Sequence, residues 1–166
     1  MAGEYQRLVH EFEPVWNAES RILVLGSFPS VKSREIAFYY GHPQNRFWKV
    51  LQAVLQQEIP QEIEGRKEFL LNNHIAVWDV IQSCDIIGSS DSSIKNVEPT
   101  ELTTLIENSK IKHIFVNGKT AEKLYKRYSE VKTGVKAIAL PSTSPANAMF
   151  SLERLCQEWN VIRDYL

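Results

Sequence analysis

Four short apolar segments that alternate with helical patterns constrain the fold of this chain more than any other feature. They are "RILVLGS" at 21–27, "IAVWDV" at 75–80, "KHIFVNG" at 112–118 and "VKAIAL" at 135–140. Such runs are typical of buried strands, and strands that alternate with helices favour a mostly parallel sheet covered on both faces. We therefore expect a three-layer α/β/α fold around a central four-stranded, mostly parallel sheet, in one domain over residues 1–166.

The intervening segments predict helices and two long loops. Apolar residues recur at helical spacing from Phe47 to Leu55, and further helices are expected near 62–73, 99–108, 119–130 and 151–166. Pro99 is expected in the first turn of one helix, and Ser151 is expected to N-cap the last. Residues 27–45 and 82–98 are polar enough to be expected as loops.

Three small polar segments follow predicted strands and are candidates for a ligand site. They are "GSFPS" at 26–30, "NGKTA" at 117–121 and "LPSTSPANA" at 140–148. In open parallel sheets, ligands bind beyond the carboxyl ends of the strands. These segments are therefore expected to converge on one pocket.

Composition excludes several classes of protein. The net charge of −1 gives no global attraction to nucleic acid, so DNA binding would need a local patch, for which Lys32, Arg34 and Arg46 are candidates. The two cysteines form no CxxC pair, which fits a reduced cytosolic protein without a zinc or iron–sulfur site. The first residues lack an apolar signal core, and no run approaches the roughly 20 apolar residues of a membrane helix. We expect a cytoplasmic monomer with no membrane partner, no metal and no cofactor.

Common nucleotide and zinc motifs are absent. A P-loop would need a glycine five residues before Gly118, and that residue is His113. "GSFPS" lacks the G-x-G-x-x-G of dinucleotide-binding turns, and neither cysteine has the partner that a zinc deaminase requires.

The segment "YYGHPQNRFWKVL" at 39–51 admits two interpretations from the residues alone. Asn45 could simply N-cap the helix that follows, with Tyr40, Phe47 and Trp48 in the core and His42 a solvated loop residue. Alternatively, the same helix N-terminus could be part of a site that handles anions, because it presents free N–H groups and partial positive charge. Capping and function are compatible.

The order of these motifs resembles the uracil-DNA glycosylase superfamily over nearly the whole chain. "GSFPS" followed by "GHPQNRFWKV" at 41–50 resembles motif 1 of the mismatch-specific uracil/thymine branch, which carries GINPG and then HPxNRFW at the same spacing. "LPSTSPANA" stands where the superfamily has its second motif, LPNPSG or HPSPL. Together with "YYGHPQN" and "VWDV", the set is similar to the hypoxanthine (deoxyinosine) DNA glycosylase family.

The resemblance implies roles for particular residues. Phe28 stands where the mismatch-specific branch has its catalytic Asn, so the catalytic amide is carried over to Asn45, which matches the Asn of HPQN. Ser142 and Thr143 replace the usual His or Asn of the second motif. The implied base-binding residues are Ser27, Phe28, Tyr40 and Asn117, and the implied DNA-binding residues are His42, Ser142, Thr143, Ser144 and Asn147.

The implied reaction is hydrolysis of the N-glycosidic bond of a deaminated base in DNA, hypoxanthine first, during base-excision repair. A monofunctional glycosylase needs neither a metal nor a covalent nucleophile, because it can stabilise the leaving base and orient water. An amide can donate to the base through its NH₂ and accept from water through its oxygen. Two alternatives remain: a uracil/thymine mismatch glycosylase, and a catalytically silent α/β module that binds DNA or nucleotides.

Overall fold

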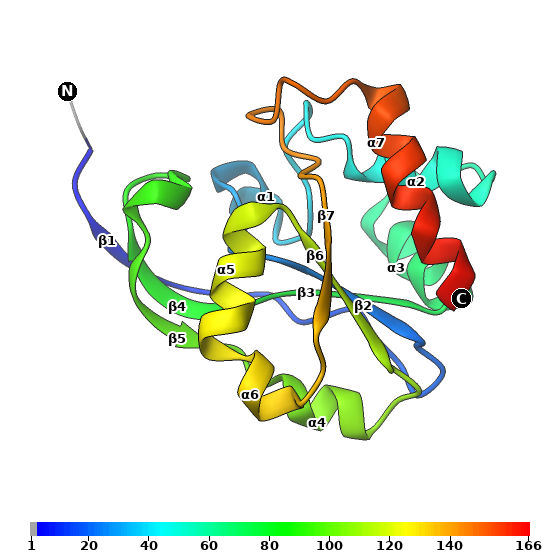
Figure 1. Cartoon of the computed structure of the whole chain (residues 1–166). Helices are drawn as coiled ribbons and strands as arrows, with labels where there is room; N and C mark the ends of the chain where they lie inside the picture. Colours follow the sequence, from blue (N-terminus) through cyan, green and yellow to red (C-terminus); the bar gives the residue numbers. More distant parts are fainter. Residues whose placement is uncertain (1–2) are drawn as a thin grey trace.

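The computed structural model describes residues 3–166, and its centre is a parallel four-stranded sheet (Figure 1). The strands β2 (Ile22–Gly26), β3 (Ile75–Asp79), β6 (His113–Asn117) and β7 (Ala137–Leu140) lie in the order β3-β2-β6-β7. All three pairings are parallel. The expected central sheet is therefore confirmed, and its four carboxyl ends share one edge.

Helices cover both faces of this sheet. The helices α2 (Phe47–Leu55), α3 (Ile63–Asn72) and α7 (Leu152–Trp159) lie on one side, and α4 (Leu102–Glu107), α5 (Lys119–Tyr128) and α6 (Glu130–Thr133) lie on the other (Figure 1). Every residue of β2 is buried, because this strand is central in the sheet and covered above and below. Burial on both faces explains why its sequence is a continuous apolar run rather than an alternating one.

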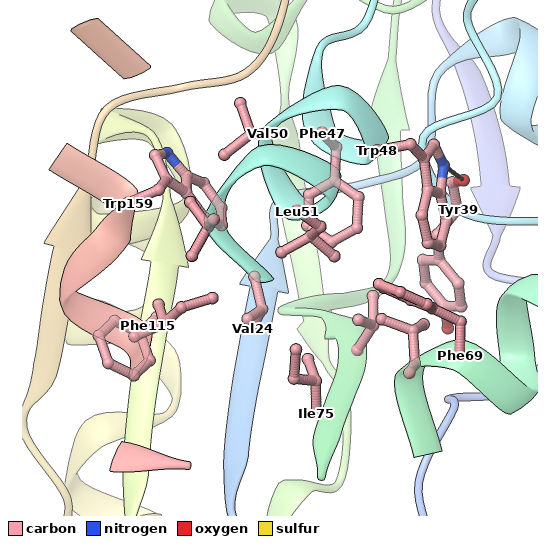
Figure 2. Close-up of a cluster of buried hydrophobic side chains, with 14 of the residues drawn as sticks. Val24, Tyr39, Phe47, Trp48, Val50, Leu51, Phe69, Ile75, Phe115 and Trp159 are labelled. Atoms are coloured by element: carbon pink, nitrogen blue, oxygen red, sulfur yellow. Dashed lines mark hydrogen bonds between the residues drawn. The ribbon is translucent and has the colours of Figure 1, made fainter. Parts of the chain in front are cut away.

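The core on the α2 side is rich in aromatic rings (Figure 2). Phe47 packs edge-on against Trp159, with ring centroids 5.9 Å apart, and joins α2 to α7. The Trp48 indole N–H donates to the main-chain oxygen of Tyr39 at 3.3 Å, which attaches the segment before α2 to the same core. The N-terminus of α2 is thereby fixed between the sheet and the C-terminal helix.

A second sheet corrects the prediction of a loop over 82–98. The strands β1 (Gln6–Val9), β4 (Ile81–Ile86) and β5 (Lys95–Pro99) form an antiparallel sheet in the order β1-β4-β5, with a 3₁₀ turn at Asp91–Ser93. In β4 the polar residues Gln82 and Asp85 are partly exposed and the other four residues are buried, whereas β5 is mostly exposed. One-sided burial leaves polar residues within the strands, so the segment resembles a loop in sequence.

Three other predicted boundaries also change. Pro99 ends β5 rather than opening a helix, and α4 begins at Leu102, where Glu101 accepts the Thr103 N–H at 2.9 Å. The expected loop 27–45 contains α1 (Val31–Ile36), whose N-cap is Ser30. The last helix is capped by Ser151 as predicted, but α7 passes into a 3₁₀ helix at Asn160–Tyr165.

Candidate active site

A cavity of about 630 Å³ lies at the carboxyl edge of the parallel sheet. β2, β3 and β6 contribute Gly26, Asp79 and Asn117 to its wall, and the loop that follows β7 contributes residues 142–146. The three polar segments expected to converge therefore do so, because parallel strands end at the same edge. The predicted residues that line the cavity are Ser27, Phe28, Tyr40, His42, Asn45, Asn117, Ser142, Thr143 and Ser144.

A chain of hydrogen bonds joins two amides through one buried hydroxyl. The Asn117 Nδ2 group donates to Thr143 Oγ1 at 3.1 Å, and Thr143 Oγ1 donates to Asn45 Oδ1 at 2.8 Å. The Asn117 oxygen also accepts the Thr143 main-chain N–H at 3.0 Å. Thr143 is fully buried, so these bonds form away from competing water.

The orientation of the Asn45 amide is fixed by its partners. Its Oδ1 accepts the Phe47 main-chain N–H at 2.9 Å as well as the Thr143 hydroxyl. A main-chain N–H can only donate, so the oxygen must face Phe47 and the NH₂ group is the end left for the cavity. Asn45 caps α2 from just before the first turn, since Arg46 holds the N-cap position. The oxygen has used both acceptor sites, which disfavours the expected role of accepting from water.

Tyr40 belongs to both the core and the cavity. Its ring stacks on Phe47, with centroids 4.0 Å apart and an interplanar angle of 21°, and it also lines the cavity. Its φ of 52° lies in the left-handed region, which costs a non-glycine residue about 1–3 kcal/mol and is common at functional sites. Burial raises the pKa of the Tyr40 phenol, the charge of Asp79 adds to this, and the nearby Asn117 side chain opposes it. The hydroxyl is buried and makes no hydrogen bond within residues 3–166.

Phe28 and Ser27, which were also predicted to bind the base, line the cavity as well. The Phe28 ring lies 5.9 Å from the Arg34 guanidinium and meets the His10 ring edge-on at 6.2 Å, so it is held between two elements. The Ser27 hydroxyl lies 3.5 Å from Asp91 Oδ1. Burial raises the pKa of the Asp91 carboxyl, while Thr120 and Ser27 oppose this.

The predicted DNA-binding residues are only partly brought to the cavity. His42 Nδ1 accepts the Gln44 N–H at 3.1 Å, which leaves Nε2 as the nitrogen available to another group. Ser142 and Ser144 hydroxyls accept main-chain N–H groups within their own loop. Asn147 does not line the cavity, because its side chain donates to the Ser142 carbonyl at 3.0 Å.

Arg46 was a candidate for the local patch that binds DNA, but its guanidinium bonds to carbonyls within the protein. Its guanidinium donates to the carbonyls of Ser144 at 3.1 Å and Asn147 at 3.0 Å, and it also donates to the Phe150 carbonyl. These bonds join the start of α2 to the loop that follows β7. The charge of Arg46 is used inside the protein.

Sequence reasoning missed Asp79 and His10. Asp79 lines the cavity, and its Oδ2 lies 2.8 Å from His10 Nε2 in a buried pair. Asp79 could have been found from the sequence, because "VWDV" places an acidic residue at the carboxyl end of a predicted buried strand. The pairing with His10 had no signal, because His10 comes from the segment after β1, which was not predicted as part of the fold.

Residues 3–166 contain neither a metal-binding cluster nor a membrane-spanning helix. In this part of the chain, no group of three or more His, Cys, Asp or Glu side chains could hold a metal ion. Nor does that part contain a helix long and apolar enough to cross a membrane.

The fold and this edge-of-sheet cavity define an α/β protein whose site is built from two amides and an aromatic wall. The family model of the Uracil DNA glycosylase superfamily matches residues 13–165, and the chain belongs to this superfamily. It is 32% identical to a protein of Methanosarcina acetivorans named hypoxanthine DNA glycosylase, over 91% of this chain and 95% of the relative. A Methanosarcina barkeri protein of the same name is 34% identical, over 65% of this chain and 70% of the relative.

A solved structure agrees with this placement. The solution NMR structure of a uracil DNA glycosylase candidate from Methanosarcina acetivorans superposes with a TM-score of 0.78 at 33% sequence identity. The superposition covers 91% of this chain and 93% of that one.

Proposed function

We propose that this protein is a monofunctional DNA glycosylase that releases hypoxanthine from deoxyinosine in DNA. The observation that carries the proposal is the Asn45 amide, whose oxygen is held by Phe47 and Thr143 so that its NH₂ faces the cavity. Membership of the superfamily and the two relatives named hypoxanthine DNA glycosylase support the same assignment.

The proposed reaction requires little beyond positioning and stabilisation of charge. The glycosidic bond from C1′ to the base nitrogen breaks, the sugar becomes cationic, and the base leaves with the bonding electrons. A water oxygen then bonds to C1′, and its proton is released to balance the charge on the base. The Asn45 NH₂ group donates to the departing base, and a preorganised donor of this kind commonly accounts for a large part of catalysis.

The base must leave the duplex before it can enter the cavity. Tyr40 and Phe28 supply aromatic surface for it, and Asn117 and Ser27 supply polar groups. We propose that His42 and the serines of the loop after β7 contact the DNA backbone, which positions the strand without reading sequence. Thr143 was predicted to join them, but it is fully buried and its hydroxyl and main-chain N–H bond to Asn45 and Asn117, so its proposed role is to orient the amides. Asn147 supports that loop from within. The protein is proposed to act as a cytoplasmic monomer.

Uracil release is the second candidate, and the similarity to a solved uracil DNA glycosylase candidate favours it. The test is free-base release from duplexes that carry deoxyinosine, deoxyuridine, deoxyxanthosine or a thymine mismatch. Fastest release from deoxyinosine is expected. Fastest release from deoxyuridine or the mismatch would favour the alternative, whereas binding of the duplexes without base release would indicate a silent binding module.

A further inference from the structure

A second pocket, of about 300 Å³, lies next to the cavity and has no role in the proposed reaction. It is formed between the first half of α2 and the start of α3, which lie on the same side of the central sheet (Figure 1). Tyr40, His42 and Asn45 line both spaces, so this α2–α3 pocket shares a wall with the cavity. Its other lining residues are Gly41, Pro43, Trp48, Lys49, Gln52, Gln61 and Arg66.

The lining of the α2–α3 pocket is positively charged. Lys49 and Arg66 contribute cations, and no Asp or Glu among residues 3–166 lines the pocket. Neither cation forms an ion pair with a residue from 3 to 166. Glu64, in the first turn of α3, pairs with Lys67 at 3.3 Å rather than with Arg66. Two cations without an acidic partner favour a negatively charged ligand.

The Arg66 guanidinium is held in place by groups of the protein itself. Its Nε donates to the Pro60 carbonyl at 2.9 Å, and its Cζ lies 4.8 Å from the centroid of the Trp48 ring. Its two Nη groups make no hydrogen bond to any residue from 3 to 166. Partial burial lowers the pKa of Arg66, because the cation has lost part of its water shell. A preorganised guanidinium with free donors is suited to bidentate binding of an oxyanion.

Two uncharged side chains around the pocket also favour an anion. His42 Nδ1 accepts the Gln44 N–H at 3.1 Å, so His42 Nε2 carries a proton and can donate. Gln52 Oε1 accepts the Ile59 N–H at 3.3 Å, which leaves the Gln52 NH₂ group as the end available to a ligand. These two groups are donors, as are the two cations, so the pocket is suited to a ligand rich in acceptors.

We propose that the α2–α3 pocket binds a phosphate group of the DNA backbone next to the flipped nucleotide. A phosphodiester carries a negative charge and presents only acceptors, and arginine and lysine are common partners of phosphate in protein–DNA complexes. Because the pocket and the cavity share a wall, a strand whose base enters the cavity can place a neighbouring phosphate in the pocket. The inference rests on the proposed function in that DNA is the ligand, and it assigns Lys49 and Arg66 as the cations that hold the strand.

The experiment measures the affinity of wild type and Arg66→Gln for a deoxyinosine duplex across a salt series. Arg66→Gln should weaken binding by about 5–20-fold at low salt. It should also make the log–log slope less negative by about 0.9, the contribution of one phosphate. The single-turnover rate at saturating DNA should stay near wild type, because the proposed contact is to the backbone and not to the base.

Arg127→Gln is the matched control. Arg127 also places its guanidinium over a ring, 5.1 Å from the centroid of Tyr128, but it lies near the end of α5 on the opposite face of the sheet. Arg127→Gln should change neither the affinity for the duplex nor the salt slope.

Neutral methylphosphonates, placed at one backbone position at a time, locate the contact. In wild type, one position beside deoxyinosine should weaken binding by a similar factor. In Arg66→Gln the same replacement should have little further effect, because both changes remove one interaction. Lys49 is exposed on α2, so Lys49→Met supplies the same comparison if Arg66→Gln fails to fold.

Inorganic phosphate is the other source of the same chemistry, and its binding is measured by calorimetry. A folded Arg66→Gln variant, or Lys49→Met in its place, with wild-type duplex affinity and salt slope would overturn the inference. Loss of inorganic phosphate binding in that same variant would then assign the pocket to the free anion. Duplex binding is measured without base release, so a wild-type protein that binds the duplex but releases no base would overturn only the proposed function.

Discussion

The Thr143 hydroxyl fixes the relative positions of the two amides in the cavity. It accepts from Asn117 Nδ2 and donates to Asn45 Oδ1. The hydroxyl is fully buried, so its loss cannot be offset by water. Its position explains how a second motif without the usual His or Asn still contributes to the site: it orients Asn45 from the opposite loop.

Replacing Thr143 by Val should test this directly. The side chains have nearly the same shape, but Val removes both hydrogen bonds of the hydroxyl. The Asn117 NH₂ group then loses its partner, and the Asn45 oxygen keeps only the Phe47 N–H. We expect a loss of about 1–3 kcal/mol in the free energy of unfolding. We also expect a clear fall in the rate of base release, measured in single turnover. Thr143→Ser retains the hydroxyl and should stay near wild type. Undiminished release by Thr143→Val would show that the orientation of Asn45 does not depend on this bond.

At the scale of elements, the loop after β7 is tied to the start of α2 by Arg46. Three main-chain carbonyls of this loop accept from the single Arg46 guanidinium, and these bonds order a segment that has no regular secondary structure. Arg46→Met should remove these bonds while keeping much of the side-chain length. Hydrogen exchange over residues 141–150 should become faster, and the variant should lose about 1.5–3 kcal/mol of stability. Lys49→Met on the exposed face of α2 is the control, and unchanged exchange in Arg46→Met would contradict the role of Arg46.

The turn between β6 and α5 depends on a glycine that the same loop approaches closely. Gly118 has a φ of 98°, and a Cβ there would lie 2.9 Å from Ser142 Cβ. Gly118→Ala should therefore combine backbone strain with displacement of the loop, at about 1–3 kcal/mol of stability, with slower base release. Gly134→Ala separates the two effects, since Gly134 has a φ of 70° but nothing lies within 4 Å of its Cβ position. Denaturation curves and rates for both variants provide the test. Equal effects on base release would show that crowding against Ser142 is unimportant.

At the scale of the whole molecule, the parts predictable from sequence are those in which one physical signal dominates. Doubly covered strands such as β2 are apolar throughout, so the central sheet and the convergence of its loops could be predicted. The β4–β5 pair could not, because one exposed face places polar residues such as Asp85 and Lys95 within the strands. The His10–Asp79 pair joins residues far apart in the chain, and only the assembled second sheet brings them together.

The overall charge of −1 sets an expectation for DNA binding. With Arg46 engaged inside the protein, few cations remain near the cavity, so few phosphates should be neutralised. Affinity for duplex DNA across a salt series should fall with a log–log slope on the order of −2 to −4, at about −0.9 per phosphate contact. A slope near zero would argue against DNA as the partner.

Single-turnover release of hypoxanthine by wild type, Asn45→Ala and Asn45→Ser tests whether the Asn45 NH₂ group drives base release. Asn45→Ala should lower the rate by about 10²–10³-fold, the usual effect of losing one preorganised donor. Asn45→Ala loses the contact to the Phe47 N–H, at about 0.5–2 kcal/mol of stability. It also leaves the buried Thr143 hydroxyl without its acceptor, at about 1–3 kcal/mol. A denaturation curve therefore accompanies the rate, and the rate is compared for the folded protein. Asn45→Ser can still accept that N–H but has no NH₂ group, and it should be as slow as Asn45→Ala. Full activity in Asn45→Ser would mean that Asn45 serves only as a cap, and would contradict the account.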